Sequence, residues 1–305
     1  MRVAAIDCGT NSIRLLVADL PDGEGEPLVD LVRRMEIVRL GQGVDRTGRL
    51  APESIERTRV ALAGYAAELT DLGAERVRMC ATSASRDAAN AQDFTDMVVE
   101  TLGVAPEVVT GDEEARLSFT GAVRGLDLPA PYLVVDIGGG STEFVVGEAG
   151  VDAALSVDIG CVRMTERHLH DDPPTPGQVA AAEADIAAAV DRALAAVGGG
   201  AATLVGLAGS VTTVAAVALG LTAYDPARIH RARVSYDEVA KVTADLLARS
   251  ARQRMEIPAM HPGRADVIGA GALVLRVIME RSGHGSVVAS EHDILDGIAW
   301  SLASR

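Results

Sequence analysis

A carboxylate beside a glycine-rich turn marks the segment Leu133 to Glu148, which reads LVVDIGGGSTEFVVGE. The apolar, β-branched runs on either side predict the two strands of a β-hairpin. Asp136 ends the first strand, and the turn carries Gly138-Gly139-Gly140 followed by Ser141. Glycines permit positive φ and let backbone N–H groups approach a ligand. N–H and hydroxyl donors suit a phosphate and the carboxylate suits a divalent cation, so the segment predicts a site for both. A hairpin whose glycines merely turn the chain is the alternative.

A second copy of this pattern lies near the N-terminus. Residues 6–18, IDCGTNSIRLLVA, align without a gap with residues 135–147, VDIGGGSTEFVVG. The alignment places Asp7 on Asp136, and it also superimposes Gly9 on Gly138 and Ser12 on Ser141. An internal repeat of this length indicates a duplicated domain, since solenoid repeats are much shorter.

Three further motifs contain groups that could bind phosphate or move a proton. The segment TGDEEARLSF opens a helix with Glu114 in its first turn, where a carboxylate either complements the helix dipole or acts as a general base. In ATSASRDAAN, a strand leads into hydroxyl groups and then Arg86 at the start of a helix. VGLAGSVTT repeats that arrangement with Gly209 and Ser210. Helix N-termini and arginine both bind phosphate, although a capped helix and a tight turn explain these motifs equally.

Several common sites are excluded by residue type. Lys241 is the only lysine among 28 basic residues and follows no glycine-rich loop, which excludes a lysine-bearing phosphate loop. The six histidines form no metal-binding pattern, and the pair His292-Asp293 is better explained as a helix cap. Glu143 stands where a dinucleotide fingerprint needs its third glycine. Three scattered cysteines predict buried apolar residues rather than disulfides or a zinc site.

The composition and net charge of the chain limit the functions it can have. A chain of 305 residues with 48% hydrophobic residues can bury two cores. The net charge of −15 argues against binding to nucleic acid or to an anionic membrane. No apolar run is long enough to span a bilayer, and the N-terminus enters a strand without a signal region, which predicts a cytoplasmic location.

The elements around the motifs predict two similar α/β domains. In the first half, strands at residues 3–7, 12–20 and 28–40 precede a helix from Pro52, a strand (77–81), a helix (about 88–102), a strand (107–110) and a helix (about 112–123). From Tyr132 the order restarts with the hairpin, a strand (151–157), a helix (176–197) capped by Thr175, a strand (203–207), more helices, a strand (286–289) and a helix from His292. We expect domains at 1–125 and 126–305, with the final helix, about 292–305, able to pack back on the first.

Seven motifs follow one another over nearly the whole chain. In order, they are IDCGTNSIRLLV, ATSASR, TGDEEARLSFTGAV, LVVDIGGGSTEFVVGE, DIGCVRMTER, GLAGSVTT and GRADVIGAGALVL. Together they resemble the exopolyphosphatase / guanosine pentaphosphate phosphatase family, within the group of actin, Hsp70 and sugar-kinase folds. The resemblance implies an α/β fold of two ribonuclease-H-like domains around an interdomain cleft. It also implies a requirement for Mg²⁺, a homodimer, and release of terminal phosphate from inorganic polyphosphate or guanosine pentaphosphate.

The resemblance assigns a role to each candidate residue. Glu114, the second glutamate of EEAR, matches the catalytic carboxylate and would activate water for in-line attack. Asp136 would hold Mg²⁺, with Asp7 or Glu143 as further ligands. The phosphate-binding residues would be Thr10, Asn11, Ser12, Arg14, Arg86, Gly138, Gly139, Gly140, Ser141, Gly209, Ser210 and Arg264. Positioning and electrostatic stabilisation supply most of what phosphoryl transfer needs.

Three functions stay open from the sequence: an exopolyphosphatase, which we favour, a guanosine pentaphosphate 5′-phosphatase, and a kinase or nucleotide-driven binding protein of the wider fold. The third is disfavoured because EEAR supplies a group that activates water. Many relatives carry an arginine where this chain has Leu295-Asp296-Gly297. The difference puts in doubt any contact by a basic side chain at this position. Longer relatives have extra C-terminal domains, so we expect this chain to prefer short polyphosphates.

Overall fold

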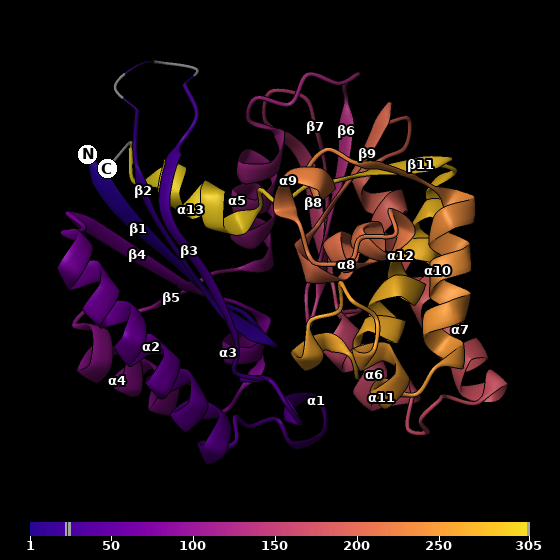
Figure 1. The fold of residues 1–305 in the computed structure, drawn as a ribbon, viewed down its shortest axis with the longest axis horizontal. Coiled ribbons are helices and arrows are strands. Elements are labelled where there is room, and N and C mark those ends of the chain that lie inside the picture. The colour runs from indigo at the N-terminus through magenta and orange to yellow at the C-terminus, as the bar shows by residue number, and fades with distance from the viewer. Residues whose placement is uncertain (22, 24–25, 304–305) are drawn as a thin grey trace. The chain divides into compact units, whose positions relative to one another are not determined.

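A computed structural model describes residues 1–21, 23 and 26–303 of the chain. The chain forms two compact units (Figure 1). The first contains residues 1–127 and the segment that begins at Asp293, and the second is Leu128–His292. The structure thus groups the final helix with the first unit, not with residues 126–292.

The first unit is built on a five-stranded sheet in the order β3-β2-β1-β4-β5. Its strands are β1 (Arg2–Cys8), β2 (Ser12–Asp19), β3 (Val29–Ile37), β4 (Arg76–Ala81) and β5 (Glu107–Val108). β1, β2 and β3 are antiparallel neighbours, whereas β1 and β4, and β4 and β5, run parallel. The repeat therefore begins as a hairpin and continues as parallel strands joined by helical crossovers.

Alternating residues of β1 send side chains to opposite faces of this sheet, and helices cover both faces. The helices are α1 (Val44–Thr47), α2 (Pro52–Leu72), α3 (Ser83–Asp87), α4 (Ala91–Leu102), α5 (Gly111–Val123) and α13 (Ile294–Ser301). Ala4 and Ile6 pack with residues of α2 and α4. Val3 and Ala5 pack with α5 and α13, which lie on the other face (Figure 1).

The second unit repeats the arrangement in a six-stranded sheet of order β10-β11-β9-β6-β7-β8. Its strands are β6 (Tyr132–Ile137), β7 (Thr142–Gly147), β8 (Val151–Val157), β9 (Thr203–Leu207), β10 (Arg233–Ser235) and β11 (Ser286–Ala289). β6, β7 and β8 are antiparallel, and β9 runs parallel to both β6 and β11. β8-β7-β6-β9-β11 corresponds strand for strand to the first sheet, so the predicted duplicated α/β fold is confirmed.

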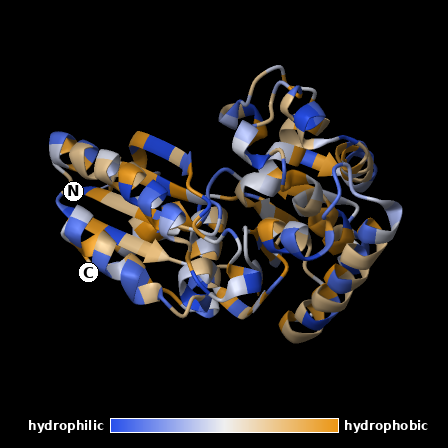
Figure 2. Cartoon of the chain, turned by 90° about the horizontal axis from the view of Figure 1, so that it is seen from below, coloured by the Kyte–Doolittle hydropathy of each residue, from blue (hydrophilic) through white to orange (hydrophobic). Residues whose placement is uncertain are grey.

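Helices also cover the second sheet. They are α6 (Cys161–His168), α7 (Pro176–Val197), α8 (Ala208–Ala218), α9 (Pro226–Ile229), α10 (Tyr236–Ala248), α11 (Ala251–Met255) and α12 (Ile268–Ser282), with a 3₁₀ turn at Pro262–Arg264. Thr175 begins α7 with a capping box, as predicted. Hydrophilic and hydrophobic bands alternate along the helices (Figure 2). Within the described part of the chain, no helix combines the length and apolar character needed to cross a bilayer.

Four local predictions are wrong. The helix predicted at about 88–102 begins only at Ala91, because Ala88 is extended and Asn90 uses its side chain to bind Leu50, and the short helix α3 (Ser83–Asp87) precedes it as a separate element. The last helix begins after Asp293 rather than at His292. The sequence analysis missed the three-residue strand β10. Among the described residues, the glycines with positive φ do not include Gly138, Gly139 or Gly140.

Candidate active site

The candidate residues gather at the carboxyl ends of parallel strands in each unit. Asp7 lies near the end of β1, next to Cys80 of β4, and Asp136 lies near the end of β6, next to Leu207 of β9. Ligands of open α/β sheets bind outside this edge. The sheet topology therefore explains why motifs distant in sequence come together within each unit.

The two glycine turns are built alike. The N–H of Gly9 donates to the carbonyl of Ser12 at 3.0 Å, and the N–H of Gly138 donates to the carbonyl of Ser141, also at 3.0 Å. These are the residues that the internal repeat aligns. The duplicated sequence therefore encodes the same turn twice.

In the second turn, the start of α6 holds the backbone carbonyls. The N–H of Cys161 donates to Gly138 O at 2.9 Å, that of Val162 to Gly139 O at 2.9 Å, and the Nε of Arg163 to Gly140 O at 2.7 Å. Because C=O and N–H point to opposite sides of a trans peptide, the N–H groups of residues 139–141 face away from α6. Three N–H groups on one side of a turn form an anion-binding concavity.

Gly160 makes this arrangement possible. A Cβ at Gly160 would lie 2.3 Å from both the carbonyl carbon and the carbonyl oxygen of Gly139. The need for glycine near this turn therefore comes from backbone packing against α6, not from the positive φ that we expected at Gly138–Gly140.

The segment after β3 holds the backbone carbonyls of the first turn, as the start of α6 does for the second. The N–H groups of Val38 and Arg39 donate to Asn11 O, and that of Gly41 donates to Thr10 O. The N–H of Asn11 shares a peptide unit with Thr10 O, so it points away from this segment. The hydroxyls of Thr10 and Ser83 are 2.9 Å apart, which ties the turn to the start of α3.

Asp7 is buried and pairs with Arg14, its cross-strand neighbour in β2. The Nε and Nη2 of Arg14 donate to the same oxygen, Asp7 Oδ2, at 3.0 and 2.7 Å, and its Nη1 donates to Asp293. Asp7 Oδ1 is shielded from solvent and has no hydrogen-bond partner among the described residues. Burial raises the pKa of the Asp7 carboxyl above its usual value, and Arg14 only partly opposes this.

Asp136 and Glu143 face each other as a cross-strand pair of β6 and β7. Both side chains are buried. Ser156 Oγ donates to Glu143 Oε1 at 2.8 Å and thereby fixes that carboxylate. Carboxylate oxygens on neighbouring strands are the kind of ligand that a hard divalent cation prefers. This pair is accordingly a candidate ligand pair for a metal ion.

Glu114 lies in the first turn of α5 and is only 8% exposed. Arg86, from α3, donates from Nη1 to Glu114 Oε2 at 3.2 Å and to the carbonyl of Val109 at 3.0 Å. The structure thus brings together two residues that the sequence analysis proposed separately, a general base and a phosphate-binding arginine.

Gly209, Ser210 and Arg264 also come together, at the start of α8. A Cβ at Gly209 would lie 2.3 Å from Arg264 Cζ, so the guanidinium lies against this glycine. Arg264 Nη1 donates to Thr213 Oγ1 at 3.4 Å. α8 follows β9 directly, which places these residues at the same sheet edge as Asp136.

The donor set fits magnesium. The described residues form no cluster of three or more His, Cys, Asp or Glu side chains suited to a metal. Mg²⁺ in phosphate-handling sites keeps several waters and uses one or two carboxylates plus phosphate oxygens. In the second unit Asp136 with Glu143 supplies such a pair. In the first unit Asp7 Oδ1 is a buried oxygen that none of the described residues satisfies.

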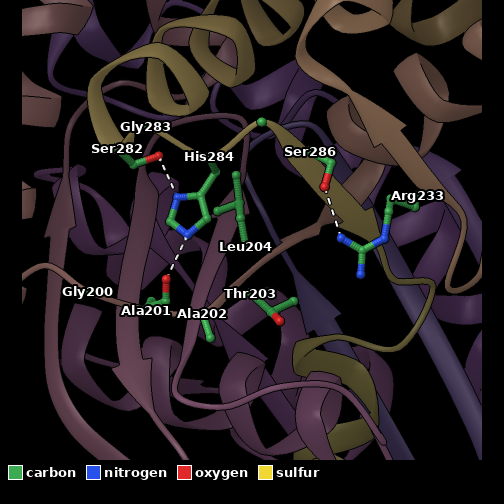
Figure 3. Close-up of a pocket in the computed structure, with 11 residues that line it drawn as sticks. Gly200, Ala201, Ala202, Thr203, Leu204, Arg233, Ser282, Gly283, His284 and Ser286 are labelled. Carbon is green, nitrogen blue, oxygen red and sulfur yellow. Dashed lines mark hydrogen bonds between the residues drawn. The ribbon is translucent and has the colours of Figure 1, made fainter.

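A cavity of about 390 Å³ lies at the opposite edge of the second sheet, where β9 and β11 begin (Figure 3). Its lining includes Arg233, Thr203 and His284 but no carboxylate. Nε2 of His284 lies 3.2 Å from the carbonyl of Ala201 and Nδ1 lies 2.9 Å from Ser282 Oγ (Figure 3). With no group to hold a metal and its histidine engaged, this cavity is not the candidate active site.

The three cysteines are buried and free, as predicted. Burial raises the pKa of each thiol, in the case of Cys80 to about 12. A protonated, enclosed thiol is a poor nucleophile, so Cys8 serves packing beside the first turn.

The sequence analysis missed one participant, Asp293. It caps α13, as proposed for the pair His292-Asp293, because its Oδ1 accepts from the N–H of Leu295 at 3.0 Å. Its second oxygen accepts from Arg14, which lies 279 residues away in the sequence. A local sequence pattern could not predict this contact.

Known proteins resemble the chain over its whole length. Residues 16–302 match the Ppx/GppA phosphatase family. A protein of Mycobacterium tuberculosis named Exopolyphosphatase 2 is 54% identical over 315 residues, which cover 99% of this chain and 98% of that protein.

Solved structures agree with this assignment. A crystal structure described as an exopolyphosphatase-like protein is 43% identical, with a TM-score of 0.94, and the match covers 99% of this chain and 97% of that one. The Ppx/GppA family member of Aquifex aeolicus is 31% identical, with a TM-score of 0.84, over 100% of this chain and 99% of that one. With these matches, the chain belongs to the Ppx/GppA phosphatase family.

Proposed function

We propose that this phosphatase is an exopolyphosphatase, which releases terminal phosphate from inorganic polyphosphate. The observation that carries the proposal is the contact between Glu114 and Arg86, a buried carboxylate with a phosphate-binding side chain 3.2 Å away. The similarity to Exopolyphosphatase 2 of Mycobacterium tuberculosis supports the choice of substrate.

Glu114 acts as the general base in this proposal. Arg86 binds an oxygen of the terminal phosphoryl group, which brings the phosphorus close to Glu114. The carboxylate accepts a proton from a water molecule while the water oxygen attacks that phosphorus in line with the bridging oxygen. The P–O bond to the bridging oxygen breaks, and the shortened polyphosphate chain leaves. Its burial matters because electrostatic interactions are stronger where bulk water is excluded. Arg86 also holds Glu114 in one orientation, since its guanidinium is fixed by the Val109 carbonyl.

The two glycine turns bind phosphoryl oxygens. In the second unit, the N–H groups of Gly139, Gly140 and Ser141 face away from α6 and are the donors. In the first unit, the donors are the N–H of Asn11 and the hydroxyls of Thr10 and Ser12. Gly209, Ser210 and Arg264 form a further phosphate-binding group at the start of α8. Such fixed donors stabilise developing charge without reorganisation.

In this proposal Asp136 and Glu143 would hold Mg²⁺ in the second unit, and Asp7 would offer an oxygen ligand in the first. When bound, Mg²⁺ would neutralise negative charge on the phosphoryl oxygens. Arg14 was expected to bind phosphate, but its guanidinium is already engaged by two carboxylates. We therefore propose that Arg14 orients Asp7 instead.

Phosphate release from short inorganic polyphosphate and from guanosine pentaphosphate, measured side by side with Mg²⁺, tests the proposal. We expect the higher kcat/KM with polyphosphate. A higher kcat/KM with guanosine pentaphosphate would overturn the choice of substrate, and no release from either would overturn the proposed activity.

A further inference from the structure

Arg14 is shared by two buried carboxylates that come from opposite ends of the chain. Two of its nitrogens meet a single oxygen of Asp7, and the third meets Asp293. The side chains of Asp7 and Asp293 are each only 6% exposed, and that of Arg14 is 19% exposed. The guanidinium is therefore held in a fixed place by both partners.

This sharing sets how Arg14 meets Asp7. An arginine facing a carboxylate alone favours a fork in which two nitrogens bind two oxygens. Here Nη1 donates to Asp293 and both remaining nitrogens donate to Asp7 Oδ2. Oδ1 is therefore left without a partner in the part of the chain that the structure describes. A buried oxygen without a partner calls for an explanation such as an ion or a ligand.

Asp293 is itself held firmly at the start of α13. Its Oδ1 caps the helix through the N–H of Leu295, and its own N–H donates to Asp296 Oδ2 at 3.0 Å. Asp296 in turn accepts from Nη1 and Nη2 of Arg33 at 3.2 and 2.7 Å. Asp293 consequently has little freedom to follow Arg14 if the guanidinium moves.

α13 also packs closely against α5, the helix that carries Glu114. A Cβ at Gly297 would lie 2.0 Å from the carbonyl oxygen of Leu117, and one at Gly121 would lie 1.9 Å from that of Asp293. The two backbones touch at these glycines. The position of Asp293 is thus fixed relative to the helix that bears the proposed general base.

We propose that Asp293 is a positioning residue for the metal site: by holding one arm of Arg14, it keeps Oδ1 of Asp7 available as an oxygen ligand. Asp293 does not touch the substrate or the metal. Without its carboxylate, Arg14 turns to the two-oxygen fork with Asp7 and occupies the ligand oxygen. This inference rests on the proposed function, because it takes Asp7 to be a metal ligand.

Asp293→Asn tests the inference, since asparagine is as good an N-cap as aspartate but cannot attract Arg14 in the same way. Mn²⁺ replaces Mg²⁺ as a probe because both prefer oxygen ligands, and the loss of its free-ion EPR signal measures binding to the substrate-free protein. We expect Mn²⁺ affinity to fall about 10- to 100-fold, the usual effect of changing a group that orients a metal ligand. Affinity within about twofold of the wild type would overturn the inference.

Two further variants separate this effect from a simple loss of structure. Asp225→Asn removes the same charge from another N-cap, that of α9, whose carboxylate accepts from the backbone N–H groups of Ala227 and Arg228, and it should leave Mn²⁺ affinity unchanged. If Asp293→Asn does not fold, Asp293→Ser, which also caps a helix, takes its place with the same expected loss.

A double-mutant cycle shows whether Asp293 acts through Arg14. Once Arg14→Gln removes the fork, adding Asp293→Asn should change Mn²⁺ affinity by less than about twofold, because coupled residues are not additive. A full additional loss in the double variant would mean that Asp293 acts by another route and would overturn the inference.

Asp7→Asn and Asp136→Asn distinguish this inference from the proposed function. Both should weaken Mn²⁺ binding more than Asp293→Asn does. If Asp136→Asn and Asp7→Asn weaken binding and Asp293→Asn does not, only the positioning role fails. If Asp7→Asn binds Mn²⁺ like the wild type, the metal assignment of Asp7 fails, and the positioning role fails with it.

Discussion

Arg14 and Glu143 occupy the same place in the duplicated hairpins and carry opposite charges. Arg14 faces Asp7 across β1 and β2, and Glu143 faces Asp136 across β6 and β7. The first hairpin therefore contains its own cation, whereas the second presents two carboxylates side by side. Duplication supplied one scaffold, and a single residue difference places an arginine opposite the aspartate in one copy and a second carboxylate opposite it in the other.

Glu143→Gln should abolish the stabilisation of the protein by Mg²⁺. A ligand that binds only the folded state raises stability by RT ln(1 + [L]/Kd), about 2.7 kcal/mol at 100 times Kd. We expect Mg²⁺ to raise the Tm of the wild type and to leave that of Glu143→Gln unchanged in thermal unfolding. Glu148→Gln, an exposed glutamate beyond the same strand, is the control and should respond like the wild type. An equal Mg²⁺ response in all three proteins would contradict the metal assignment.

Glu114→Gln should lower kcat by about 10² to 10⁴, the contribution of a general base, with little change in Tm. Glu113→Gln is a matched control in the same helical turn. Its side chain is 45% exposed and pairs with Arg78, so its loss should change kcat by less than about twofold. Single-turnover release of phosphate separates the two variants, and near-normal kcat in Glu114→Gln would refute the role of Glu114.

Arg86→Lys should lower kcat/KM for polyphosphate by about 10- to 100-fold. A lysine has one compact charge and cannot bind Glu114, the Val109 carbonyl and a phosphoryl oxygen together. Hydrogen bonds to charged groups contribute about 1.5–3 kcal/mol, which corresponds to this range. Arg59→Lys, at an exposed pair with Glu56, is the control for the exchange itself. Equal kcat/KM for both variants would argue against a substrate contact by Arg86.

Asp7→Asn should leave Tm at pH 7 unchanged or higher, despite its expected loss of activity. The pKa of Asp7 is raised in the folded protein by burial, so its charged form opposes folding once the pH exceeds the folded pKa. Below the unfolded pKa, about 3.9, the carboxyl is neutral in both states and the advantage of asparagine should vanish. Tm measured from pH 4 to pH 8 checks this, and a large loss at pH 7 would contradict it.

Asp293→Asn should show the opposite pH dependence of stability. Burial alone would raise the pKa of Asp293, but Arg14, the N–H of Leu295 and Arg33 outweigh burial and lower it. Its stabilising contribution is therefore present above the unfolded pKa and is lost as the pH falls through the folded pKa. Asp293→Asn should lower Tm at pH 7, with a difference that shrinks as the buffer becomes acidic. A constant difference from pH 4 to pH 8 would speak against a role for its charge.

The fold was predictable because its sequence pattern occurs twice in the chain. Two hairpins with matching aspartates, glycines and serines, each followed by alternating helices and strands, leave little choice of topology once the duplication is seen. Short elements escaped prediction. β10 has three residues, and the break between α3 and α4 depends on Asn90 binding Leu50, a contact forty residues away in sequence.

The candidate site was predictable to the extent that its residues lie in local motifs. Glu114 and Asp136 could be named because one lies in the first turn of a helix and the other near the end of a strand. Arg86 was expected at the start of a helix, but it lies in the last turn of α3. The pairing of Arg14 with Asp293 could not be foreseen, because it joins residues whose only link is the folded sheet. The role of the glycines was misjudged for the same reason, since Gly160 and α6, not the turn alone, decide what fits at Gly139.

α13 follows the whole second unit in the chain but belongs to the first unit. The second unit is a continuous stretch from Leu128 to His292. Val3, Ala5 and Leu16 of the first unit pack against Ile294, Leu295 and Ile298, which are synthesised only after that stretch. We therefore expect this apolar face of the first sheet to stay uncovered during translation until the second unit has been made.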